Sequence, residues 1–174
     1  MHDRFGASFG TALANLMPVL SGFLGVIIAD VPLSATGGAL PPPLFALMPI
    51  YFWCLVRPDL MRPGAVFAIG LAHDLLSGGP PGAWAAGFLV AYAFVDRQRD
   101  VFAGLASWGA ILGFAAVALI ASAVAYAIVA IAYTRLPPLA PLMLQIGMSV
   151  LFYVPALAAM NGFQHRFIGP LRSI

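Results

Sequence analysis

Long apolar stretches make up most of this chain, and its few charged residues stand in the breaks between them. Only 8% of the residues are charged and 62% are hydrophobic, whereas a soluble domain has about 25% charged and about 45–50% apolar residues. Such a chain cannot cover its surface in water, but apolar side chains are a suitable exterior in lipid. The sequence therefore predicts an all-α polytopic membrane protein and argues against a soluble enzyme.

Six apolar segments are predicted to be transmembrane helices, which need about 20 mostly apolar residues. They end at charged residues or at turns rich in glycine and proline. No cleavage pattern follows the first segment, so we interpret it as a retained membrane helix. We expect a single transmembrane domain over residues 1–174, with segments at 8–29, 43–56, 63–76, 83–95, 101–133 and 139–163.

The segments at 63–76 and 83–95 are short for full membrane crossings, and the turn at 77–82 joins them. They form either two spans or a re-entrant hairpin. A membrane tolerates a re-entrant turn only where it is buried in protein or faces a water-filled cavity. The sequence leaves both alternatives open.

The arginines indicate the orientation, because loops on the cytoplasmic side of a membrane are enriched in basic residues. With a cytoplasmic N-terminus, six spans place seven of the eight arginines inside and only Arg135 outside. The seven are Arg4, Arg57, Arg62, Arg97, Arg99, Arg166 and Arg172. This split predicts a multi-pass protein with both termini in the cytoplasm. The arginines are too scattered for a nucleic-acid surface, so no nucleic-acid partner is expected.

Asp74 and His73 are ionisable residues near the end of an apolar segment, where a charge inside a bilayer is expensive and by default functional. A structural role is the favoured alternative, because Asp74 stands close enough to the next segment to cap its N-terminus. No second acid is nearby to share catalysis with it. His73 is expected to face a different side of the helix.

Small residues are predicted to mark helix–helix contacts, as they do in lipid. Gly70 and Gly64 are expected to let their segment pack closely on a neighbour. The fifth segment carries a face of such residues, namely Gly104, Ala106, Gly109, Ala110, Gly113, Ala116, Ala121, Ser122, Ala123 and Ala125.

Pro18, Pro49 and Pro155 lie inside apolar segments and are expected to bend their helices. Residues 49–53 include Tyr51 and two further aromatic residues, a cluster that we interpret as a membrane-interface anchor. Cys54 is the only cysteine, which rules out an intramolecular disulfide, and we expect it to be a small buried apolar residue.

Several enzyme signatures are missing from the sequence. It has no zincin motif, no glycine-rich phosphate loop and no Gly-x-Ser-x-Gly elbow. Six aspartates distributed over loops and segment ends do not provide converging acids. No catalytic, cofactor-binding or metal-binding residues are therefore predicted, and no cofactor is expected.

The order of features between residues 43 and 82 resembles the MreD family of bacterial rod shape-determining proteins. The resemblance begins with the run at 43–52 and the break at Arg57-Pro58, and it is most specific over residues 70–82. That family has Gly-Leu-x-x-Asp-x-x-x-Gly-x-Pro-Leu-Gly, and Pro81 departs from it where leucine is usual. The residues that carry the match are Pro49, Tyr51, Arg57, Gly70, Asp74, Gly78, Pro80 and Gly82.

The resemblance implies a non-enzymatic scaffold subunit of the complex that elongates the bacterial cell wall. It implies a place in the inner membrane beside the single-span partner MreC, in an assembly with MreB, RodA and a class B penicillin-binding transpeptidase. Membrane lipids are further expected partners. The implied fold is similar to the six-helix substrate-binding subunits of energy-coupling-factor transporters.

That fold similarity leaves an alternative function, a small-molecule-binding subunit of a membrane transporter. It predicts a polar pocket near the outer ends of the helices, around Asp74 and His73. An enzyme acting on a lipid-linked substrate is a third hypothesis with less support from the sequence.

Overall fold

The computed structural model of the chain describes residues 3–30, 41–98 and 107–167. These residues form six α-helices and no β-strand, which confirms the prediction of an all-helical protein. The helices are α1 (Asp3–Asp30), α2 (Leu47–Val56), α3 (Pro63–Ser77), α4 (Ala83–Arg97), α6 (Ser107–Tyr133) and α7 (Leu139–Phe167).

The predicted segment bounds agree best where proline or glycine sets the end of a helix. Pro63 occupies the first position of α3, where its missing N–H costs nothing. Helix α2 begins at Leu47 rather than at the predicted residue 43 and is only 10 residues long. The predicted start of the fifth segment, at 101–106, lies outside the described residues.

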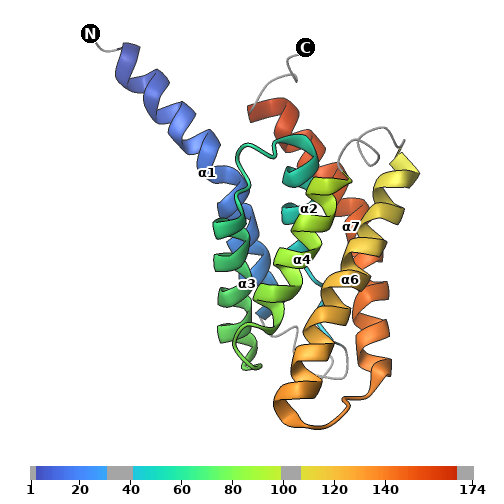
Figure 1. Cartoon of the computed structure of the whole chain (residues 1–174). Coiled ribbons are helices and arrows are strands. Elements are labelled where there is room, and N and C mark those ends of the chain that lie inside the picture. The colour runs from blue at the N-terminus through green and yellow to red at the C-terminus, as the bar shows by residue number, and fades with distance from the viewer. Residues whose placement is uncertain (1–2, 31–40, 99–106, 168–174) are drawn as a thin grey trace.

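The helices run alternately up and down in one bundle (Figure 1). Helix α1 begins and α7 ends at the same end, where α2 is joined to α3 and where α4 also ends. We call this the charged end, because the exposed residues Arg62, Asp96 and Arg97 belong to it. The opposite end holds the α3–α4 turn and the α6–α7 turn, and we call it the hairpin end (Figure 1).

Helix α2 forms the centre of the core, because it packs against α1, α4, α6 and α7. Its residues from Leu47 to Cys54 are all buried. The Tyr51 ring lies edge-on to the rings of Phe114 and Tyr153, with centroids 5.7 Å apart in both pairs. The Tyr51 hydroxyl donates a hydrogen bond to the Ala110 carbonyl oxygen at 3.2 Å.

Two expectations for this region are wrong. The aromatic residues at 51–53 are 1–2% exposed, so they build the core instead of anchoring an interface. Pro49 lies in the first turn of α2, where a backbone N–H has no partner within the helix, so it removes no helical hydrogen bond and gives no reason for a bend. Cys54 is buried, as expected.

Glycines set the closest helix–helix approaches. A Cβ atom on Gly70 of α3 would lie 2.5 Å from the Cα of Ala85 on α4, and one on Gly87 of α4 would lie 2.7 Å from the carbonyl oxygen of Ala121 on α6. The expectation for Gly70 is therefore confirmed. The one for Gly64 is wrong, because that residue has open space around it.

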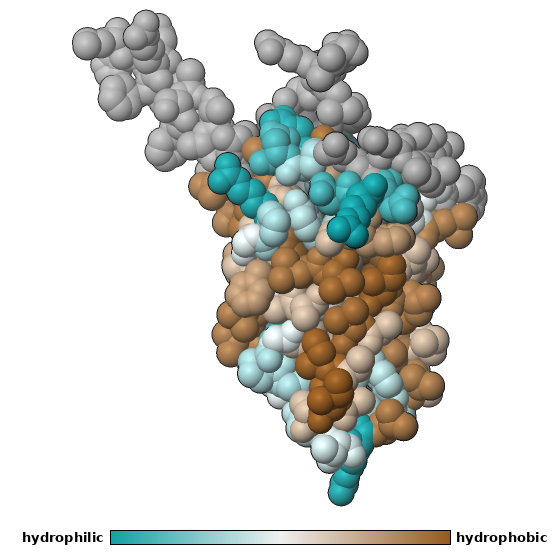
Figure 2. All heavy atoms as spheres, in the orientation of Figure 1, coloured by the Kyte–Doolittle hydropathy of each residue, from teal (hydrophilic) through white to brown (hydrophobic). Residues whose placement is uncertain are grey.

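An apolar band covers the middle of the visible face, between hydrophilic atoms near the charged end and paler, mixed atoms toward the hairpin end (Figure 2). Two stretches, Gly109–Tyr133 of α6 and Leu139–Gly162 of α7, are long and apolar enough to cross a membrane. Large apolar side chains on their outer faces are well exposed, such as Leu112 at 70% and Leu151 at 65%.

Candidate functional site

Asp74 joins the two helices of the α3–α4 hairpin. The residue is 1% exposed, and its carboxylate accepts hydrogen bonds from three backbone N–H groups at the start of α4. Gly82 and Ala85 donate to Oδ2 at 2.9 and 3.1 Å, and Trp84 donates to Oδ1 at 2.8 Å. The first N–H groups of a helix have no partner within the helix and carry its positive dipole end, so a buried carboxylate is well stabilised there. The expected capping role of Asp74 is confirmed.

The glycines and the proline of the same stretch shape the turn. Gly78 ends α3 with φ of 68°, and Gly82 precedes α4 with φ of 98°. Both angles are in the left-handed region that glycine adopts without strain. The Pro80 carbonyl oxygen accepts a hydrogen bond from the Ala83 N–H at 3.2 Å. The residues that carry the family resemblance in this stretch therefore form one tight connection between two helices.

His73 also faces α4. It is 4% exposed, and its ring lies edge-on to the Trp84 ring at 5.4 Å and stacked over the Phe88 ring at 6.0 Å. The expectation that His73 and Asp74 face different sides is therefore wrong. Adjacent residues point about 100° apart on a helix, and the broad contact between α3 and α4 includes both directions.

Arg57 follows α2 at the charged end. Its Nε and Nη2 atoms donate to the two carboxylate oxygens of Asp59 at 3.2 and 3.1 Å. These hydrogen bonds from Arg57 lower the pKa of the Asp59 carboxyl. The pair closes the short loop between α2 and α3 and is solvent-exposed, so it contributes little to stability.

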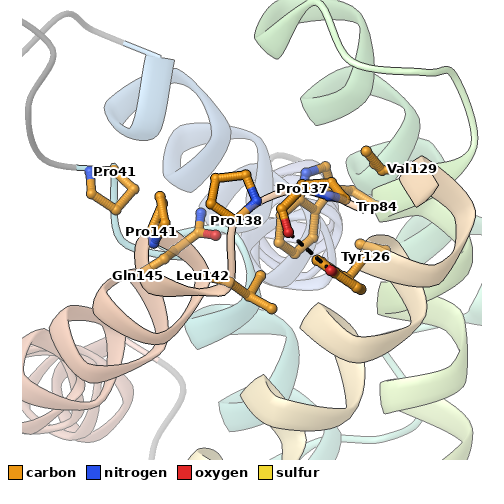
Figure 3. Close-up of a pocket in the computed structure, with 10 residues that line it drawn as sticks. Pro41, Trp84, Tyr126, Val129, Pro137, Pro138, Pro141, Leu142 and Gln145 are labelled. Atoms are coloured by element: carbon orange, nitrogen blue, oxygen red, sulfur yellow. Dashed lines mark hydrogen bonds between the residues drawn. The ribbon is translucent and has the colours of Figure 1, made fainter. Parts of the chain in front are cut away.

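A pocket of about 210 Å³ opens at the hairpin end, between α4, α6 and α7 (Figure 3). Its residues are mainly proline, aliphatic and aromatic: Pro41, Trp84, Ala125, Tyr126, Val129, Pro137, Pro138, Pro141, Leu142 and Gln145. Trp84 lines it and contacts the His73 ring, but neither His73 nor Asp74 is a lining residue. The polar pocket around Asp74 and His73 that a transporter subunit predicts is therefore not the one found here.

Two polar residues of α7 fix the segment before α2. Ser149 Oγ accepts a hydrogen bond from the Leu44 N–H at 2.8 Å and donates to the Gln145 carbonyl oxygen. Gln145 Nε2 donates to the Pro42 carbonyl oxygen at 3.0 Å. Sequence reasoning missed these residues and the pocket, because their partners are about 100 positions away and no motif links them.

In the described part of the chain, no three histidine, cysteine, aspartate or glutamate side chains are grouped so that they could hold a metal ion. The fold and the site define a helical bundle that contains an internally capped helical hairpin. Comparison with protein-family models, curated proteins and solved structures finds no match to the chain.

Proposed function

We propose that this chain is a multi-pass inner-membrane scaffold of the bacterial cell-wall elongation complex, similar to MreD, and that it binds the membrane segment of MreC. Six helices cross or enter the bilayer, and the charged end faces the cytoplasm. The proposal rests on the residue pattern at 70–82 and on the apolar exterior of the bundle.

The observation that carries the proposal is the use of the Asp74 carboxylate. Its oxygens accept hydrogen bonds from three backbone N–H groups at the start of α4. The one acidic residue of the motif is therefore used to join two helices. A general acid or base must instead reach a reacting atom of a substrate. The motif therefore has a structural role in the hairpin. Such a role fits a protein that binds partners through the surfaces of its helices.

Helices α1 and α7 offer the surface for the partner. Both pack on α2, but they make little or no contact with each other. The outer face of α1 exposes Leu16, Leu20 and Leu24, and that of α7 exposes Leu151 and Val154. An incoming single-span helix that lies between them would contact two rows of apolar residues and the side of the core.

The test is a mild-detergent purification of the tagged chain from its native membrane, with mass spectrometry of the proteins that come with it. We expect MreC in near-equal amount. Recovery of ATPase subunits in place of MreC would contradict the proposal and favour a transporter subunit.

A matched pair of variants tests the docking face. Leu151→Trp on α7 is expected to reduce MreC recovery several-fold, because it adds bulk where the partner packs. Leu112 is 70% exposed but belongs to α6, which is not one of the two helices of the proposed docking surface, so Leu112→Trp is expected to leave recovery unchanged. Equal loss or equal retention in the two variants would place the partner elsewhere.

A further inference from the structure

The pocket at the hairpin end is lined mainly by apolar residues, and we call it the slot. Its volume of about 210 Å³ is below the roughly 300–1,000 Å³ of sites that hold compact small molecules. Ala125, 3% exposed, is its most buried residue, and Trp84, Val129 and Leu142 line it with aromatic and aliphatic surface. This apolar lining suits a hydrocarbon chain better than a polar ligand.

Hydrogen bonds hold the walls of the slot in place. The Tyr126 hydroxyl donates to the Pro137 carbonyl oxygen at 2.9 Å, which fixes the α6–α7 turn against α6 (Figure 3). The bond from Gln145 to Pro42 holds the opposite wall, next to Pro41. A preformed slot spares a ligand the cost of ordering its site.

The α6–α7 turn next to the slot has the composition of a membrane interface. The α6–α7 turn that leads into Pro137 exposes Tyr133 at 56% and Leu136 at 82%, with Arg135 between them. Exposed aromatic and aliphatic residues beside one arginine are typical of the headgroup level of a bilayer. Within the described residues, Arg135 forms no hydrogen bond or ion pair. It is therefore an exposed cation available to an anion, two positions before Pro137, which lines the slot.

We propose that the slot binds one acyl chain of an anionic phospholipid and that Arg135 pairs with the phosphate of its headgroup. The proposal rests on the membrane placement argued under the proposed function and adds a lipid site on the outer side. Apolar lining selects the chain, and the single positive charge selects the headgroup. The pairing of arginine with phosphate is a charge-assisted contact of the kind that fixes lipid and ligand orientation.

Trp84 makes the site measurable, because bromine atoms on an acyl chain quench tryptophan fluorescence on contact. The full chain is reconstituted in phosphatidylcholine vesicles that contain brominated phosphatidylglycerol or, in a parallel sample, the same fraction of brominated phosphatidylcholine. We expect phosphatidylglycerol to be preferred about fivefold, which is the preference that one arginine gives for an anionic lipid. The preference should disappear in Trp84→Phe, which removes the reporter in the slot and leaves Trp53 and Trp108, and in Arg135→Gln.

Arg62→Gln is the matched control, because Arg62 is an exposed arginine at the opposite end of the bundle. It should keep the full preference. Equal quenching by the two brominated lipids would overturn the lipid site and leave the MreC proposal standing. Failure of the chain to float with the vesicles would overturn both the membrane placement and the lipid site.

Discussion

At the scale of single residues, the buried polar groups of this protein differ in how well they are paired. Asp74 has three backbone donors and Ser149 has two partners, whereas the hydroxyl of Ser122 is buried without a hydrogen-bond partner among the described residues. Burying a polar group is costly unless it is hydrogen-bonded. The same type of substitution should therefore have different effects at different positions.

Asp74→Asn should destabilise the protein by about 2 kcal/mol. An amide has only one acceptor atom, so at least one of the three N–H donors loses its partner and the helix loses the charge at its N-terminus. Thermal unfolding in a fixed detergent should shift downward by about 4–8 °C. A variant as stable as the parent would show that these backbone bonds contribute nothing.

Asp59→Asn is the control for that experiment, because Asp59 has an exposed partner in Arg57. Its folded-state pKa is lowered, so its contribution is present above the unfolded pKa of about 3.9 and is lost as the pH falls through the folded value. We expect a change of at most about 0.5 kcal/mol at neutral pH and none at strongly acid pH. A larger effect would mean that the loop at 57–62 supports the fold.

Ser149→Ala and Ser122→Ala form a second matched pair of buried hydroxyls. The first leaves the Leu44 N–H without its acceptor and should cost about 1–3 kcal/mol. The second removes an unpaired hydroxyl and should be neutral or stabilising. Thermal unfolding of the two variants checks the order, and a reversal would contradict the hydrogen-bond assignment.

The role of Asp74 could be predicted because it follows from local distance along the chain. Eight to eleven positions separate the carboxylate from its donors, and the turn at 77–82 brings them together. The hydrogen bond between Ser149 and Leu44 could not be predicted, because it depends on how α7 packs against α2. Sequence reasoning recovers polar contacts across a single turn and misses those that need the whole bundle.

At the scale of helices, glycines set how closely two neighbouring helices approach each other. Helices α3 and α4 meet at Gly70, and α4 and α6 meet at Gly87, in both cases against backbone atoms of the facing helix. Backbone atoms cannot move aside as a flexible side chain can. The two contacts align three helices in series.

Gly70→Ala should separate α3 from α4 and cost about 1–3 kcal/mol, the usual range for overpacking. Its new Cβ would lie 2.5 Å from the Ala85 Cα and would also disturb the Asp74 cap. Gly64→Ala, on the same helix, has open space and should be neutral or stabilising by up to about 1 kcal/mol, because alanine favours helix. Comparing the thermal unfolding of the two variants separates packing from helix propensity, and equal values would contradict the close contact.

Helix ends were predictable where proline or glycine marks them, as at Pro63, Gly78 and Gly82. The position of α2 at the centre of the core was not predictable. A run of aromatic residues next to a charged loop is compatible both with a membrane interface and with a protein core. The residues of α2 are also apolar on every side of the helix. Without a polar face, periodicity cannot tell which neighbours a helix contacts.

At the scale of the whole molecule, the proposed membrane placement allows two depths for the α3–α4 hairpin. Fifteen residues of helix span about 22 Å, and the hydrocarbon layer is about 30 Å thick. Helix α6, with 27 residues, spans about 40 Å and is long enough to cross. The hairpin therefore reaches the outer face only if the turn and flanking loops complete the crossing, and otherwise it is re-entrant.

Single cysteines labelled with a membrane-impermeant maleimide distinguish these two arrangements. Cys54 is the only native cysteine and is buried, so Cys54→Ala provides the background. Gly79→Cys tests the hairpin turn, where a new side chain has room. Arg135→Cys reports the outer face, and Gln98→Cys, exposed at the charged end, reports the cytoplasmic face.

In intact spheroplasts, six spans predict labelling at positions 79 and 135, with position 98 labelled only after permeabilisation. A re-entrant hairpin predicts the same results at 135 and 98 but no labelling at 79 from outside, because its turn stops within the bilayer. The Asp74 cap is compatible with both, since it satisfies the first N–H groups of α4 without water. Labelling of position 98 in intact cells would instead reverse the orientation that the arginines predict and would move the Arg135 site to the cytoplasmic leaflet.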